Sequence, residues 1–177
     1  MKLNNQKGIT IIMLVIAVIM MIIIVSFAVF NAPKSTEEAK IAKAYTSLKT
    51  IKEACENALY YIEINPTEYD EYYFFGGNIQ HKITNGMISG IDLGETAIKF
   101  GLASESDFSP RTYIIKPASN DEEQRILKNL ELKGVEETYI VDLENEKYYV
   151  LNGVTRGEES RVYEYKDILL SYEMLTN

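Results

Sequence analysis

The chain has 177 residues, a formal net charge of −8 and a single cysteine, Cys55. One cysteine excludes an internal disulfide and a multi-cysteine zinc site. The acidic balance disfavours direct nucleic-acid binding, because it repels phosphate. All 26 acidic side chains lie after residue 30, whereas Lys2 and Lys7 are the only charged residues before Lys34. We therefore expect an apolar N-terminal segment followed by one acidic domain over residues 31–177.

The apolar segment covers residues 9–30, which carry no charge and only two polar side chains, Thr10 and Ser26. At about 1.5 Å per residue this run reaches roughly 33 Å, close to the thickness of a bilayer's hydrocarbon core. The pattern predicts a transmembrane helix. Lys2 and Lys7 precede it, so the positive-inside rule predicts a single-pass membrane protein with a cytoplasmic N-terminus and an extracellular domain.

Two cleavage sites compete in this segment. Ser26-Phe27-Ala28 has the small-x-small pattern of a secretory signal, but the uncharged run before Ser26 is longer than the usual h-region of about 7–15 residues. The other site follows Gly8, where a polar leader of residues 1–8 ends and the apolar run begins at Ile9. Glycine lacks a Cβ and leaves its carbonyl open to a peptidase, so we favour this cut.

The sequence around that cut, Lys7-Gly8-Ile9-Thr10-Ile11-Ile12, resembles the processing site of type IV prepilins and pseudopilins. The resemblance implies that prepilin peptidase cuts after Gly8 and that Ile9 becomes a methylated N-terminus. It further implies a structural subunit of a cell-surface filament, without catalytic activity, cofactor or small-molecule substrate. The implied partners are other pilin subunits, the assembly platform and the membrane. Type IV pili, type II secretion and DNA uptake all use this architecture, and the sequence does not distinguish them.

One position departs from the family pattern. The fifth residue after the glycine is usually glutamate, whose carboxylate pairs with the N-terminal amine of a neighbouring subunit in the apolar filament core. Here that position is Met13, which cannot form the pair. A subunit at the filament tip has no earlier amine to neutralise, so we expect a minor pilin that initiates or caps the filament. The alternative is an uncleaved, signal-anchored extracellular binding domain or enzyme.

After the apolar run, Pro33 predicts a kink or a short interruption of the helix. Ser35 and Glu38 form a capping box that restarts it. Apolar residues then recur at helical spacing up to about Ile64, where Asn65-Pro66 ends the pattern. The amphipathic half of the long N-terminal helix is therefore expected over about residues 35–64.

The rest of the domain is expected to form an antiparallel β-sheet packed on that amphipathic half, an α+β fold like that of pilins. Residues 138–143 and 147–151 predict a β-hairpin that resembles strand pairs of pilin-like proteins from Gram-positive bacteria. The other expectations are strands over 112–116 and 161–165, a helix over 120–130, short strands and loops over 74–101, and either state over 167–175.

Four features are candidate sites, and for each we favour a structural role. His81 has no nearby cysteine and no nucleophile motif. Cys55 lies on the apolar stripe of the helix, and we expect it to be a small buried hydrophobic residue. The hairpin acids offer oxygen ligands to calcium but lack EF-hand spacing, so a solvated turn is expected. The aromatic stretch over residues 60–75 is either an adhesive or subunit-contact surface, or a set of rings that partly anchors the helix to the sheet. The hairpin acids are Asp142, Glu144 and Glu146, and the aromatic stretch contains Tyr60, Tyr61, Tyr69, Tyr72, Tyr73, Phe74 and Phe75.

Overall fold

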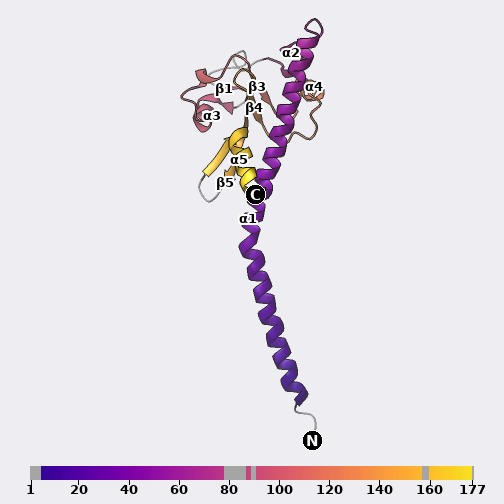
Figure 1. The fold of residues 1–177 in the computed structure, drawn as a ribbon, viewed down its shortest axis with the longest axis vertical. Helices are drawn as coiled ribbons and strands as arrows, with labels where there is room; N and C mark the ends of the chain where they lie inside the picture. The colour runs from indigo at the N-terminus through magenta and orange to yellow at the C-terminus, as the bar shows by residue number, and fades with distance from the viewer. Residues whose placement is uncertain (1–4, 78–86, 89–90, 157–159, 177) are drawn as a thin grey trace. The chain divides into compact units, whose positions relative to one another are not determined.

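A computed structural model describes residues 5–77, 87–88, 91–156 and 160–176, and the side chains of 16–22, 36–77, 87, 91–156 and 160–176. The chain forms two compact units, residues 1–39 and 40–177. The predicted α+β class is confirmed: a long helix and several short ones accompany a four-stranded antiparallel sheet (Figure 1). The second unit holds this sheet and its hydrophobic core.

Helix α1 runs over Asn5–Ile64, 60 residues in all. The predicted end at Ile64 is confirmed, since Pro66 cannot continue the helical hydrogen bonding. Of the two predictions for Pro33, the interruption is wrong, because α1 has helical secondary structure without a break, and the kink stays a prediction. A single proline removes only one helical donor, and the good helix formers that follow it in Glu37, Glu38 and Ala39 favour continuation.

The predicted transmembrane helix needs a correction. In the parts of the chain that the structure describes, no helix meets both the length and the apolarity that crossing a membrane requires. A span needs about 20 consecutive apolar residues, and the apolar side chains that are described in this region cover only residues 16–22. This finding overturns the transmembrane half of the predicted fold and the predicted single-pass membrane localisation. The side chains of residues 9–15 and 23–30 lie outside the described residues.

The sheet is a simple antiparallel meander in the order β3-β4-β5-β6. The predicted hairpin is confirmed as β4 and β5, whose last paired residues before the turn are Asp142 and Lys147. The predicted strands at 112–116 and 161–165 are confirmed within a residue or so. The bounds are Thr112–Ile115 for β3, Tyr139–Asp142 for β4, Lys147–Arg156 for β5 and Ser160–Glu164 for β6.

Both faces of the sheet are covered, which explains why β4 is buried along its whole length. Alternate residues of a strand point to opposite faces. On one face, Val141 and Tyr148 belong to the same core cluster as Leu48 of α1. On the other face, Ile140 and Tyr149 share a second cluster with helix α3, Leu93–Lys99. The amphipathic part of α1 therefore packs on the sheet as predicted.

The remaining elements are short. Strands β1 (Met87–Ile88) and β2 (Ile91–Asp92) confirm the short strands expected over 74–101, but α2 (Glu71–Phe75) and α3 were not predicted. The helix predicted over 120–130 is α4, Asp121–Asn129. The segment left open at 167–175 is helical and belongs to α5, Tyr165–Thr176. A 3₁₀ turn, η2, covers Glu105–Asp107.

Candidate functional site

The residues predicted to direct processing and assembly all fall within α1. They are Gly8, Ile9, Met13 and Pro33. Their backbone is helical, but their side chains lie outside the described residues. The structure therefore leaves the cleavage after Gly8 and the role of Met13 as predictions.

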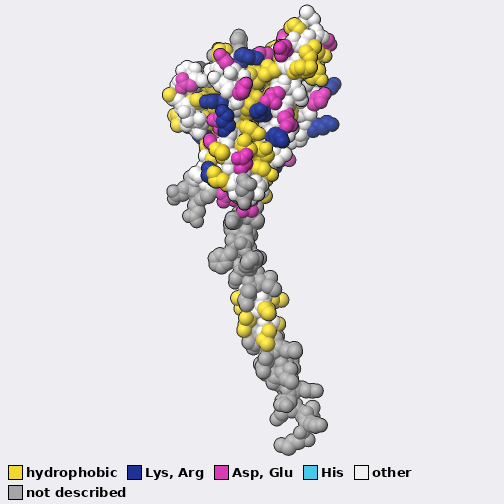
Figure 2. All heavy atoms as spheres, viewed as in Figure 1, with side chains coloured by type: hydrophobic (Ala, Val, Ile, Leu, Met, Phe, Trp, Pro, Cys, Tyr) yellow, Lys and Arg dark blue, Asp and Glu magenta, His cyan; other side chains and the backbone are white. Residues whose placement is uncertain are grey.

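In the N-terminal unit, side chains are described at residues 16–22 and 36–39, and those of 16–22 are apolar and exposed. The large side chains there, from Ile16 to Ile22, are between 50% and 70% exposed. Figure 2 shows them as hydrophobic atoms around the helix. A helix that is hydrophobic on all sides is normally buried against other chains or other elements. This segment is therefore a candidate contact surface.

The part of α1 in the second unit behaves differently, since one stripe of it is fully buried. Its buried members are Ile41, Leu48, Ile51, Cys55 and Ala58, each at most 2% exposed. Their spacing of three, four and seven residues places them on one helical face. The opposite face carries charged side chains, including an i,i+4 ion pair between Lys49 and Glu53. This half of α1 anchors the domain and presents a polar surface.

A second candidate surface lies where α1 ends and α2 begins. Its side chains are mostly tyrosines, which are joined by ring contacts from Tyr60 to Tyr61 at 6.4 Å, Tyr61 to Tyr69 at 6.0 Å and Tyr69 to Tyr73 at 5.2 Å between centroids. We call this surface the tyrosine patch, and it consists of Tyr60, Tyr61, Ile64, Tyr69, Tyr72 and Tyr73. All but Tyr69 are at least 38% exposed.

The reading in which some rings of the aromatic stretch anchor the helix while others stay exposed is confirmed, and the reading as an adhesive or subunit-contact surface stays a prediction. Phe74 and Phe75 are buried at 4% and 1% exposure, and they belong to the core cluster that contains α1 and the sheet. These two rings anchor α2. Tyr60 and Tyr72, in contrast, are 60% and 61% exposed and contribute little to the core. Figure 2 shows hydrophobic atoms exposed near this end of α1, with acidic side chains among them.

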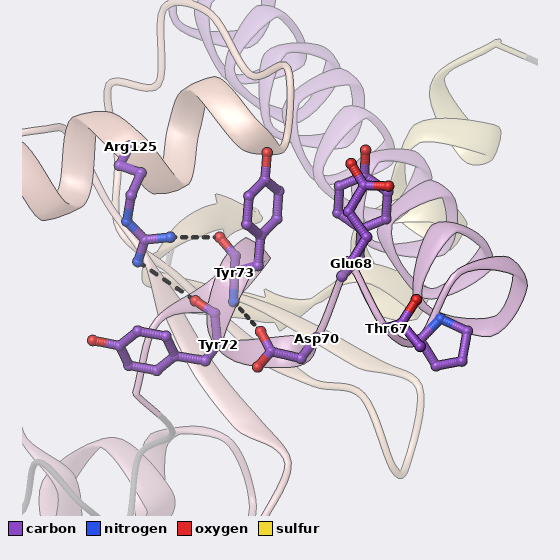
Figure 3. A pocket seen from close by; sticks show the side chains of 8 residues that line it. Thr67, Glu68, Asp70, Tyr72, Tyr73 and Arg125 are labelled. Carbon is purple, nitrogen blue, oxygen red and sulfur yellow. Dashed lines mark hydrogen bonds between the residues drawn. The ribbon is translucent and has the colours of Figure 1, made fainter.

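Local hydrogen bonds fix the backbone of the patch (Figure 3). The Asp70 carboxylate accepts from the backbone N–H of Tyr73 at 2.7 Å and caps the start of α2. At the other end of this short helix, Arg125 of α4 donates to the carbonyl oxygen of Tyr73 at 2.7 Å, and Asn129 donates to the same oxygen at 2.8 Å. The Arg125 guanidinium also lies 5.5 Å from the centroid of the Tyr72 ring. Helix α2 is thus held at both ends.

A hollow of about 240 Å³ opens beside these residues, between the 66–70 loop, the tyrosines of α2 and Arg125. Its carboxylates are Glu68, which accepts from the Asn65 amide at 2.6 Å, and Asp70. The charge of Glu68 raises the pKa of the neighbouring Tyr69, with a further contribution from their hydrogen bond. Tyrosine side chains, two carboxylates and one guanidinium thus line the hollow.

Glu71 ties the start of α2 to the sheet. Its carboxylate accepts a hydrogen bond from Arg111 Nε at 2.8 Å and another from the hydroxyl of Tyr113. Burial raises the pKa of Tyr113, and the hydrogen bond to Glu71 raises it further. The charge of Glu71 is therefore matched by Arg111, which leaves Glu63, Glu68 and Asp70 as the exposed acids of this region.

Cys55 is confirmed as a buried hydrophobe. It is 0% exposed within the core cluster, and burial raises the pKa of its thiol well above the ordinary value. A thiol that stays protonated is a poor nucleophile. No role in catalysis follows for it.

The acidic turn of the hairpin is solvated only in part, which corrects the prediction for one of its three members. Glu144 and Glu146 are exposed, but Asp142 is 4% exposed. The Asp142 carboxylate accepts from Ser109 Oγ at 2.7 Å and from the backbone N–H and side-chain amide of Asn145 at 3.0 and 2.9 Å. Burial acts to raise the pKa of Asp142, but these hydrogen bonds outweigh it and the pKa is lowered. Asp142 is thus a structural acceptor inside the turn.

His81 lies outside the described residues. Within the described ranges, no three or more histidine, cysteine, aspartate or glutamate side chains are grouped so as to hold a metal ion. The sequence reasoning missed Arg125, because it is 52 residues from the carbonyl that it binds and nothing in the local pattern of α4 links it to α2.

Comparison of the chain with protein-family models, with curated proteins and with solved structures finds no match.

Proposed function

We propose that this protein is a minor type IV pilin-like or pseudopilin-like structural subunit, which assembles into a filament through the N-terminal part of α1. The observation that supports this best is the contrast along a single helix. Residues 16–22 expose apolar side chains, whereas from Ile41 onward one stripe of α1 is buried in the domain. A continuous 60-residue helix with these two parts suits a subunit whose apolar part packs against the same part of other copies and whose domain lies outside that bundle.

The processing step of the proposal rests on the sequence resemblance around Gly8. Prepilin peptidase cuts after this glycine and Ile9 becomes the N-terminal residue. Mass spectrometry of the protein isolated from its host tests this step. We expect a chain that begins with methylated Ile9. A mature chain that retains Lys2 contradicts the proposal and favours an unprocessed binding module instead.

The assembly step has a separate test, which uses the burial of the only cysteine. Since Cys55 is 0% exposed, a cysteine introduced elsewhere is the only reactive thiol of the folded chain. We expect Ile19→Cys to give disulfide-linked dimers on mild oxidation of assembled material, because each chain then carries one reactive thiol and position 19 is buried between copies. Glu105→Cys, on the exposed η2 turn of the domain, is the matched control and should stay monomeric on a reducing-agent-free gel. Equal cross-linking of the two variants, or none at position 19, contradicts assembly through this segment.

A further inference from the structure

The tyrosine patch exposes large aromatic and aliphatic side chains to solvent. Tyr60, Ile64 and Tyr72 are each 60% or 61% exposed, and Tyr61 is 52% exposed. Aromatic side chains dominate the energetics of protein interfaces and are enriched at their centres. All six members of the patch lie in α1, the loop or α2, where backbone hydrogen bonds and the Asp70 cap hold the chain.

The charge of the patch indicates which partner it suits. Between residues 60 and 73 the sequence has four acidic residues and no basic one. Arg111 pairs with Glu71, while Glu68 and Asp70 accept from neutral donors, the Asn65 amide and the backbone N–H of Tyr73. Exposed carboxylates beside exposed tyrosine rings attract cations by two routes, the charge and the negative ring face.

The patch already accommodates one guanidinium. Arg125 lies 5.5 Å from the centroid of the Tyr72 ring while it donates to the carbonyl of Tyr73. As Figure 3 shows, this side chain reaches the patch from α4 and leaves Glu68 and Asp70 on the other side of the Tyr73 backbone. The hollow of about 240 Å³ between them has room for the end of a further side chain.

We propose that the tyrosine patch is a docking surface for a basic polypeptide segment, whose lysine or arginine side chains lie on the exposed tyrosine rings beside Glu63, Glu68 and Asp70. The ring faces and the carboxylates recognise the cationic groups, and the hollow beside Tyr72 receives one of them. Every residue of this docking surface belongs to the second unit, whereas the proposed assembly segment, residues 16–22, belongs to the first.

The test measures binding of a short labelled peptide of alternating lysine and serine to the full chain by fluorescence anisotropy in non-ionic detergent. The same peptide with glutamine in place of lysine is the probe control. We expect Tyr60→Ala combined with Tyr72→Ala to weaken binding of the lysine peptide about tenfold, the effect of losing two ring contacts. Tyr60→Phe with Tyr72→Phe should retain it, because the rings remain. Ile98→Ala with Leu170→Ala, which truncates two apolar side chains that are 69% and 52% exposed elsewhere, should have no effect.

A second set of variants tests the charge while it keeps the fold. Glu63→Gln, Glu68→Gln and Asp70→Asn together remove three charges, and Asn at position 70 still caps α2. We expect this triple variant to bind about tenfold more weakly, and the triple control Glu105→Gln, Glu131→Gln and Glu144→Gln to bind within about twofold of wild type.

Several outcomes overturn the proposal. If both triple variants lose affinity for the lysine peptide equally, the peptide responds to the overall acidity of the protein. If the affinity is unchanged after truncation of Tyr60 and Tyr72, the tyrosine patch is not the binding surface. Equal binding of the glutamine peptide excludes recognition of cations. A patch that binds a neutral oligosaccharide but not the lysine peptide, or whose tyrosines change only self-association in sedimentation, has another occupant. A negative result for peptide binding does not change the expected results for N-terminal processing or for cross-linking at position 19. The docking proposal and the filament proposal can therefore be contradicted separately.

Discussion

Single carboxylates set much of the local structure in this acidic protein. Asp142 and Glu123 are held by hydrogen bonds from neighbouring donors, and each has a lowered pKa. Both sit where a backbone segment changes direction, Asp142 at the hairpin turn and Glu123 at the start of α4. Sequence reasoning treated Asp142 as part of a solvated turn, because one of its hydrogen-bond partners, Ser109, is 33 residues away.

Glu123 allows a prediction about pH. Its carboxylate accepts from the backbone N–H and hydroxyl of Ser119 at 2.7 and 2.6 Å and from Lys116 at 2.9 Å. Burial acts to raise its pKa, but these partners outweigh it and bring the pKa to about 2, below the ordinary 4.5. A lowered pKa means that the stabilisation is complete above the unfolded-state pKa and is lost as the pH falls toward the folded-state pKa.

We therefore expect Glu123→Gln to lower the free energy of unfolding by about 2 kcal/mol at pH 7, since hydrogen bonds to a charged acceptor are replaced by those to an amide. The difference from wild type should shrink between about pH 4.5 and pH 2. Urea titrations at several pH values measure it. The control, Glu131→Gln at an exposed position, should stay within about 0.5 kcal/mol of wild type. A difference that is constant down to pH 2 contradicts this account.

Among the secondary-structure elements, α1 combines an apolar surface that is buried in its own domain with an apolar surface that is exposed. Leu48 is 0% exposed in the core of the domain, while Ile19 is 50% exposed in the N-terminal unit. Both are aliphatic side chains of similar size, so they differ in their contribution to the free energy of unfolding only through the contacts that bury each of them.

A pair of truncations separates these contributions. We expect Leu48→Ala to cost about 2–5 kcal/mol in the free energy of unfolding, because it leaves a cavity between α1 and the sheet. Ile19→Ala should change the unfolding of the domain by less than about 0.5 kcal/mol. Thermal unfolding of the unassembled chain, followed by near-ultraviolet circular dichroism of the tyrosines, measures both. Similar losses in the two variants would show that the N-terminal segment is packed within the same subunit.

The sheet shows where element prediction from sequence succeeded. The β4–β5 hairpin and strand β3 are rich in β-branched and aromatic residues, so local propensity and tertiary environment agree. Helix α3 was missed because Leu93–Lys99 is only 7 residues long and follows a glycine-rich stretch. Its start is set by Asp92, which accepts from Glu95 N–H at 3.0 Å, and its buried Leu93 and Ala97 gain their stability from the second face of the sheet.

At the scale of the whole molecule, the proposed filament role depends on Met13. If this subunit lies first in the filament, a glutamate at position 13 has no earlier N-terminal amine to pair with. We expect Met13→Glu to reduce the number of filaments per cell and to move the subunit from the tip into the shaft. The reason is that the new carboxylate is stabilised only when it pairs with the N-terminal amine of another subunit. Immunogold labelling in electron micrographs counts filaments and locates the subunit. Met13→Leu, which stays apolar, is the control.

Unchanged filament number and unchanged position in the Met13→Glu strain would remove the mechanism that places this subunit at the tip. Processing after Gly8 would then still stand as a prediction of its own, since the peptidase acts before assembly.

Local patterns in the sequence were enough to predict the α+β class, the end of the long helix at Ile64, the hairpin and the burial of Cys55, because each depends on local periodicity or on proline and turn chemistry. They also led to the spanning helix that the structure contradicts, and to an interruption at Pro33 that α1 does not have. The exposure of individual tyrosines, the contacts of Arg125 with Tyr72 and Tyr73, and the burial of Asp142 became known only from the folded chain. These outcomes depend on contacts between residues that are far apart along the chain, and no local pattern carries that information.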